Sequence, residues 1–174
     1  MTIGAEVIAI DDTDWVGDAE SITTVGEVNF QCVDTFVDNV LSDLGTRQMA
    51  LLHIQAHGDP GGISFGHHYV TVANFPSYSP RLRGLAPKFT SGAWVDLRAC
   101  EVGQNLPLMH LFRTLWNVGL VAGRGLQNNL FDANFGRYQI VSARGEETTS
   151  FAVPPWVAYS TSRRAARGIL SRIF

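Results

Sequence analysis

Two short apolar runs constrain the fold of this sequence more than any other feature. Leu51–Ala56 ends in His57-Gly58 and a glycine-rich turn, and Ala93–Ala99 ends in Cys100. Short apolar runs closed by glycine are typical of strands buried in a sheet. In an open α/β sheet, the residues just beyond the carboxyl ends of parallel strands meet at one edge. The two runs therefore predict neighbouring strands that bring an imidazole and a thiol together.

Further strand patterns occur before and after these runs. Strands are expected at Glu6–Ile10, Met49–Ala56, Ala93–Ala99, Leu120–Ala122 and Arg137–Ser142. A hairpin is expected from Ile63–Phe65 and Tyr69–Val72, with His67 and His68 in its turn. Adjacent residues point apart, and no other ligand spacing accompanies these two histidines, so no metal site is expected there.

Apolar spacings of three and four predict two helices. The first begins at Phe30 and ends at Gly45, and the second follows Asn105, a candidate N-cap, and ends at Gly119. Residues 73–92 contain several prolines and are expected to form a long loop with at most one helical turn. Since strands and helices alternate, the sequence predicts an α/β fold with a mainly parallel sheet and helices on both faces.

Composition indicates one domain spanning residues 1–174. A chain of 174 residues with 45% apolar and 17% charged residues can bury one core. Its two cysteines do not make a disulfide framework, and Cys32 is expected to be a packed, inert thiol on the first helix. Neither a secretory signal nor a membrane-spanning run is recognised, so we expect a cytoplasmic protein with no membrane association.

Charge is distributed unevenly along the chain. Residues 1–46 hold ten of the 16 acids and none of the 13 bases. Residues 161–174 combine four arginines with an apolar stripe, which is typical of a basic amphipathic helix. We expect this tail to pack on its own acidic domain, and membrane or partner binding is the alternative. The bases form no nucleic-acid motif, so no nucleic-acid partner is expected.

The two strand ends have the parts needed for acyl transfer. A thiol is a nucleophile as its thiolate, so Cys100 needs a nearby base, and His57 is the candidate. The backbone N–H groups of Gly58 and Cys100 are candidates for the oxyanion hole. Below this site, His53 and Gln55 share one face of their strand, as Asp96 and Arg98 share one face of theirs; this pattern predicts either a polar network or ion pairs that support the fold.

The segments His57-Gly58-Asp59-Pro60-Gly61 and Arg98–Gly103 resemble the two signatures of the caspase-like cysteine peptidases. This group includes caspases, legumains, gingipains, separases and the bacterial CHAT proteases, and the motifs are closest to the legumain-like and CHAT types. The resemblance covers residues 47–125. It implies a caspase-hemoglobinase-like three-layer sandwich and a dyad of His57 and Cys100. It also implies cleavage of a protein or peptide substrate, and neither a metal nor an organic cofactor.

Two further residues are candidates for determining substrate specificity. Arg124 and Asp132 are candidates for the substrate pocket because they lie between the fourth and fifth predicted strands. Asp132 would favour a basic substrate residue, and Arg124 an acidic one. The leading interpretation is a regulatory cysteine endopeptidase acting on a protein partner. The alternatives are a catalytically silent caspase-like binding or signalling module and a small flavodoxin-like domain, although the acidic segment after the first strand disfavours phosphate binding.

Overall fold

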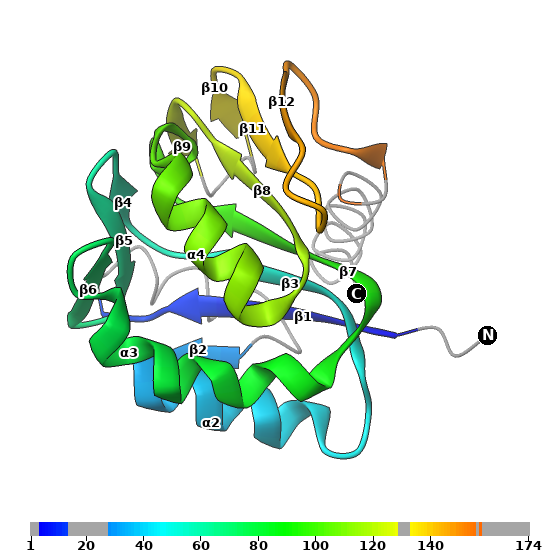
Figure 1. Cartoon of the computed structure of the whole chain (residues 1–174). Coiled ribbons are helices and arrows are strands. Elements are labelled where there is room, and N and C mark those ends of the chain that lie inside the picture. The colour runs from blue at the N-terminus through cyan, green and yellow to red at the C-terminus, as the bar shows by residue number, and fades with distance from the viewer. Residues whose placement is uncertain (1–3, 14–27, 129–132, 156, 158–174) are drawn as a thin grey trace, which may run out of the picture.

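The computed structural model describes residues 4–13, 28–128, 133–155 and 157. Its main sheet has seven strands in the order β12-β11-β8-β7-β3-β1-β2 (Figure 1). In chain order these are β1 (Ala5–Asp11), β2 (Val28–Phe30), β3 (Met49–Gln55), β7 (Phe89–Arg98), β8 (Gly119–Gly123), β11 (Tyr138–Val141) and β12 (Glu147–Ser150). Neighbours from β2 to β8 are parallel, whereas β11 is antiparallel to both β8 and β12. The predicted α/β class and mainly parallel sheet are confirmed.

Two small sheets follow the carboxyl ends of strands in the main sheet. After β3 comes a three-stranded sheet of β4 (Gly58–Asp59), β5 (Gly62–Phe65) and β6 (His68–Thr71). After β8 comes a hairpin of β9 (Leu126–Asn128) and β10 (Ala133–Phe135). The first contains the expected hairpin, whereas the second was not predicted. Both lie at the sheet edge at which the chemistry was expected.

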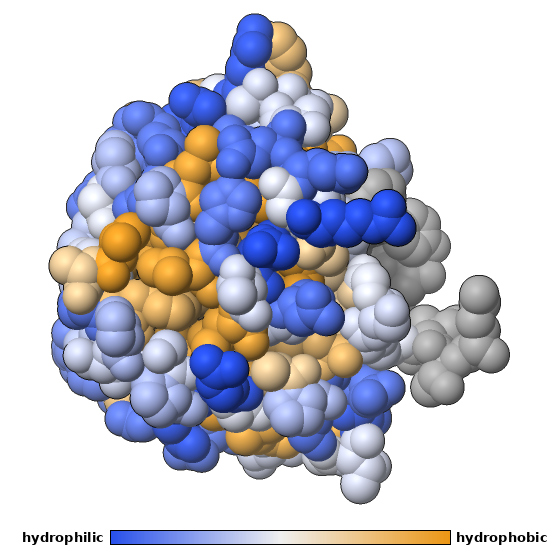
Figure 2. Space-filling model, in the orientation of Figure 1, coloured by the Kyte–Doolittle hydropathy of each residue, from blue (hydrophilic) through white to orange (hydrophobic). Residues whose placement is uncertain are grey.

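Three α-helices and two 3₁₀-helices accompany the strands in the described ranges. They are α2 (Val33–Leu44), α3 (Phe75–Leu82), η1 (Arg83–Lys88), η2 (Val102–Gln104) and α4 (Leu106–Trp116). Apolar side chains from one face of the main sheet join those of α2, α3 and α4 in a single buried core. Hydrophilic residues surround the apolar areas on the surface that Figure 2 shows. None of the described helices is long and apolar enough to cross a membrane.

The opposite face of the main sheet is covered differently. Its apolar residues Leu51 and Val121 pack with Val153 and Val157, and Val157 lies in a first helical turn. Helices α2, α3 and α4 therefore lie on the first face, and Val157 is a helical residue on the opposite face. The expectation of α-helices on both faces is therefore confirmed for the first face within the described residues.

Helix α2 begins later than predicted. Phe30 ends strand β2, and the helix starts at Val33 with Cys32 as its N-cap. The sulfur of Cys32 accepts the backbone N–H of Thr35 at 3.5 Å, while the Thr35 hydroxyl oxygen accepts the backbone N–H of Cys32 at 3.1 Å. The hydrogen bond with the Thr35 side chain lowers the pKa of the Cys32 thiol. The predicted position of Cys32 within the helix was therefore wrong, because it caps the helix, and the inertness of its thiol stays a prediction. Gly45, with φ of 54°, ends the helix as expected.

The long loop predicted over residues 73–92 is instead helix α3, helix η1 and the start of β7. Pro76 lies in the first turn of α3, where a backbone N–H has no partner within the helix. Pro80 removes one helical hydrogen bond, but the hydroxyl of Ser79 donates to the Pro76 carbonyl at 3.2 Å. Because the apolar residues at both ends of α3 are buried, packing outweighs the cost of its prolines.

Helix α4 begins as predicted but ends earlier. The Asn105 side chain accepts the Leu108 N–H at 3.1 Å, which confirms Asn105 as the N-cap. Asn117, with φ of 54°, ends the helix in place of Gly119. Gly119 lies in β8 under the indole of Trp94, where a Cβ atom would lie 2.6 Å from the ring.

Candidate active site

His57 and Cys100 occupy equivalent positions after neighbouring parallel strands. Gln55 of β3 and Arg98 of β7 are register partners. His57 lies two residues after Gln55, and Cys100 lies two residues after Arg98. Neighbouring strands lie about 5 Å apart, which is within the reach of side chains. His57 is exposed and Cys100 is half-buried. The predicted adjacency of these two strands is confirmed.

Gly58 brings the two turns into direct contact. A Cβ atom at this position would overlap Cγ2 of Val102, and it would lie 2.9 Å from Cβ of Ala99 and 3.2 Å from the carbonyl oxygen of Cys100. Only glycine leaves room for this approach. The two N–H groups expected to hold an oxyanion, those of Gly58 and Cys100, therefore belong to turns that pack against each other.

Side chains hold the glycine-rich turn after His57 in place. The carboxylate of Asp59 accepts the Tyr69 hydroxyl at 2.6 Å and the backbone N–H of Gly61 at 2.5 Å. The hydrogen bond with Tyr69 lowers the pKa of Asp59, while burial and that same bond raise the pKa of Tyr69 to about 12. The Asn105 amide also donates to the Gly61 carbonyl at 3.0 Å, which links the turn to helix α4.

The turn that carries Cys100 has a left-handed residue. Glu101 has φ of 57°, which is uncommon for a residue with a side chain. Its backbone N–H donates to the Gly125 carbonyl at 2.9 Å, and its carboxylate accepts the Gln104 amide at 3.1 Å. Gly103 then passes so close to β8 that a Cβ atom would lie 2.6 Å from the Ala122 carbonyl oxygen. Cys100 is therefore placed by a turn that packs against the end of β8.

The sulfur of Cys100 contacts strand β9. The backbone N–H of Gln127 donates to Sγ at 3.3 Å, and the thiol donates to the Gln127 carbonyl at 3.9 Å. Both backbone groups of one strand residue point to the same side, so Cys100 faces the edge of β9 that does not pair with β10. Sequence reasoning missed Gln127. Its strand is three residues long and has no alternating pattern to reveal it.

A buried polar network lies below the two turns. Nδ1 of His53 is 2.9 Å from Oδ2 of Asp96, and Nε2 of His53 is 3.1 Å from Oε1 of Glu6. Nε of Arg98 donates to the same Asp96 oxygen at 2.8 Å. Burial alone would raise the pKa of Asp96, but the charge of Arg98 and the hydrogen bond with His53 lower it to about 2. Of the four residues predicted to share this face, His53, Asp96 and Arg98 form a polar network that includes the Asp96–Arg98 ion pair, so both predicted alternatives are present together. Gln55 is buried, and Glu6 is an addition to the network.

The remaining candidate residues have other positions. Arg124 is exposed, and its guanidinium donates to the buried Gln139 side chain at 3.0 Å. Asp132 and the basic tail 161–174 lie outside the described residues. His68 does not lie in the hairpin turn but begins β6, and its Nδ1 accepts the N–H of Val33 at 3.4 Å. Within the described ranges, no three His, Cys, Asp or Glu side chains are grouped to hold a metal ion.

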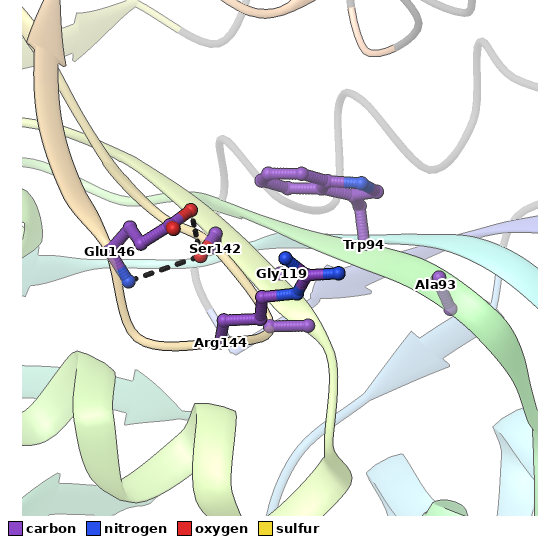
Figure 3. A pocket seen from close by; sticks show the side chains of 8 residues that line it. Ala93, Trp94, Gly119, Ser142, Arg144 and Glu146 are labelled. Atoms are coloured by element: carbon purple, nitrogen blue, oxygen red, sulfur yellow. Dashed lines mark hydrogen bonds between the residues drawn. The ribbon is translucent and has the colours of Figure 1, made fainter.

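A cavity of about 250 Å³ lies between residues of β7, β8 and the segment after β11 (Figure 3). It is lined by Trp94, Gly119, Arg144 and Glu146, among others, and the hydroxyl of Ser142 contacts the Glu146 carboxylate beside it. Gly119 begins β8 and is the register partner of Trp94, which lies six residues before Cys100, whereas His57 and Cys100 follow the carboxyl ends of β3 and β7. This cavity is therefore separate from the candidate active site.

Residues 27–118 match the sequence pattern of a domain of unknown function, DUF4347. The match covers more than half of the chain. The chain belongs to the DUF4347 family. The part of this DUF4347 protein that matches includes both His57 and Cys100 and the strands that position them. No curated protein and no solved structure matches the chain.

Proposed function

We propose that this DUF4347 protein is a caspase-like cysteine endopeptidase with Cys100 as nucleophile and His57 as general base. The observation that carries the proposal is the packing of Gly58 against Ala99 and the Cys100 carbonyl. Together with the register of β3 and β7, this contact joins the two turns that hold the reactive side chains. The motif resemblance and the mixed α/β sheet support a caspase-hemoglobinase-like fold.

The reaction follows from the two side chains. His57 takes the thiol proton, and the thiolate of Cys100 attacks the carbonyl carbon of the substrate peptide. The N–H groups of Gly58 and Cys100 stabilise the negative charge on the carbonyl oxygen. His57 then gives its proton to the leaving amine, and a thioester remains on Cys100. Water, deprotonated by His57, hydrolyses the thioester and restores the thiol.

The proposed substrate is a protein or peptide, and the proposed role is regulatory rather than degradative. We place the activity in a reducing compartment such as the cytoplasm, where the two free thiols of the described chain would stay reduced.

A second candidate function is a catalytically silent binding module of the same fold. The contact of the Cys100 sulfur with both backbone groups of Gln127 favours it, because a substrate must displace this contact before the thiolate can attack. In that case peptides would bind near the hairpin β9–β10 without being cut.

A labelling experiment tests the peptidase. The purified chain is incubated with a peptide library and with a peptidyl acyloxymethyl ketone, which forms a covalent bond with an activated thiol. All variants carry Cys32→Ser, so that Cys100 is the one thiol left in the sequence, and serine preserves the N-cap. We expect cleavage and labelling in this background, and loss of both in Cys100→Ala.

His57→Ala separates the two candidate functions. A peptidase predicts that this variant loses cleavage by at least about 100-fold while circular dichroism remains unchanged. Labelling that is unaffected by His57→Ala would contradict the dyad. Peptide binding without turnover in the Cys32→Ser background would support the silent module instead.

A further inference from the structure

The hairpin β9–β10 presents two large apolar side chains to solvent. Leu126 is 61% exposed and Phe135 is 68% exposed. The two residues are direct register partners across the hairpin. Side chains in such pairs lie on the same face about 5 Å apart, so they form one continuous apolar surface. An exposed apolar surface of this kind is typical of a binding site.

The residues before and after Leu126 are both hydrogen-bonded to the turn that carries Cys100. The preceding residue, Gly125, accepts the N–H of Glu101 at 2.9 Å, and the following residue, Gln127, donates its N–H to the sulfur of Cys100 at 3.3 Å. Leu126 is therefore one residue from a direct contact with Cys100. A peptide whose scissile bond lies at Cys100 would pass beside the hairpin.

Arg124, a charged candidate for the substrate pocket, is hydrogen-bonded outside the hairpin. The Arg124 guanidinium donates to Gln139, a buried residue of β11 whose register partner is Ala122 of β8. Neither side chain of the Leu126 and Phe135 pair has a polar group to recognise a charged substrate residue. The described part of the hairpin therefore offers apolar contact area beside Cys100.

We propose that Leu126 and Phe135 form an apolar subsite that selects peptides with a large apolar side chain close to the scissile bond. This inference rests on the proposed peptidase function and specifies its substrate class. Seating a leucine, methionine or phenylalanine side chain on this surface removes apolar area from water on both partners. An alanine, aspartate or lysine at the same substrate position gains much less.

The test uses peptides that differ at one position only. A set of fluorogenic hexapeptides carries Leu, Met, Phe, Ala, Asp or Lys at each position in turn on the amino-terminal side of the cut. The full chain with Cys32→Ser is compared with Leu126→Thr and Phe135→Thr, which keep β propensity. Val72→Thr is the matched control, because Val72 is 41% exposed and lies in the turn after β6, outside the hairpin.

We expect kcat/KM to be at least about tenfold higher for large apolar residues than for Ala, Asp or Lys at one position. Leu126→Thr and Phe135→Thr each lower the ratio of kcat/KM for the Leu peptide to that for the Ala peptide by most of this factor, and Val72→Thr leaves the ratio intact. Equal cleavage of all peptides, or a preference unchanged by both hairpin variants, would overturn the subsite and leave the peptidase standing.

Binding separates this inference from the proposed function. Cys100→Ala is titrated with the uncleaved, fluorescein-labelled Leu and Ala peptides, and fluorescence polarisation is measured. If Cys100→Ala binds the Leu peptide more tightly than the Ala peptide, and if adding Leu126→Thr abolishes this difference, the subsite is supported even if the wild-type chain cuts no peptide. Equal affinity for both peptides would count against it whether or not the chain is a peptidase.

Discussion

Gly58 and Val102 lie in contact across the two turns, with no room for a side chain between them. Gly58 begins β4 after the strand that leads to His57, and Val102 begins η2 after Cys100. The separation of the two candidate catalytic residues is therefore set by a backbone approach that a single methyl group would prevent.

Replacing Gly58 by alanine tests this contact. The added Cβ forces Val102 or the turn to move, so we expect a loss of about 1 to 3 kcal/mol in the free energy of unfolding, measured with urea. Labelling of Cys100 should also slow. Gly84→Ala is the control, because its Cβ would lie 3.5 Å from Val37, an ordinary contact. A Gly58→Ala chain as stable as Gly84→Ala would disprove the close packing.

Asp96→Asn should change how stability depends on pH. The pKa of Asp96 is lowered from 3.8 to about 2, so its ionised form stabilises the fold above pH 3.8, and this contribution is lost as pH falls through about 2. The shift corresponds to about 2 kcal/mol. Urea unfolding measures how much the free energy of unfolding falls between pH 7 and pH 2. This decrease should be smaller in Asp96→Asn than in the wild type by about this amount.

The same variant should be less stable than the wild type at pH 7. Arg98 and His53 are buried and would lose a charged partner, which typically costs about 3 to 5 kcal/mol. Parallel pH curves for the two proteins would contradict the assignment of Asp96 as the titrating group.

Asn105 has two roles that substitutions can separate. Asn105→Asp keeps the oxygen that caps helix α4 but lacks the amide that donates to the Gly61 carbonyl, whereas Asn105→Ala lacks both. We expect losses of about 1 and about 2 kcal/mol, respectively. Amide hydrogen exchange in residues 58–63 should accelerate in both variants, and exchange in the first turn of α4 only in Asn105→Ala. Identical exchange in the two variants would refute the separation.

Glu101→Gly should be more stable than Glu101→Ala. Both lose the carboxylate that accepts the Gln104 amide, so their difference reports the left-handed backbone at φ of 57°. Alanine bears a steric cost of about 1 kcal/mol there that glycine does not. Chemical denaturation of the two variants measures this difference. Equal stability, or a more stable alanine variant, would show that the left-handed conformation is relaxed in solution.

The sequence predicted the parts of the fold that depend on periodic apolar patterns. The strands leading to His57 and Cys100 and the cap of α4 at Asn105 follow from local rules that tertiary packing reinforces. The face shared by His53, Asp96 and Arg98 was also predictable, because alternation along a strand fixes which side chains lie together.

Other features depend on contacts that single segments do not reveal. Helix α3 forms despite Pro76 and Pro80 because its ends are buried in the core. Cys32 caps α2 because Thr35 completes a reciprocal pair of hydrogen bonds, a role usually given to serine. The position of Gln127 against Cys100 depends on a short hairpin whose register no sequence pattern specifies.

The lateral bonds of Asp96 have a consequence for natural variation in this family. Asp96 connects His53 on β3 with Arg98 on β7, and His53 in turn reaches Glu6 on β1. Three strands are thus tied together by side chains, all but that of Glu6 buried, below the turns that carry His57 and Cys100. If the proposed peptidase function holds, a conservative exchange at this depth is expected to alter turnover without touching the substrate, and inspection of the surface alone would overlook it.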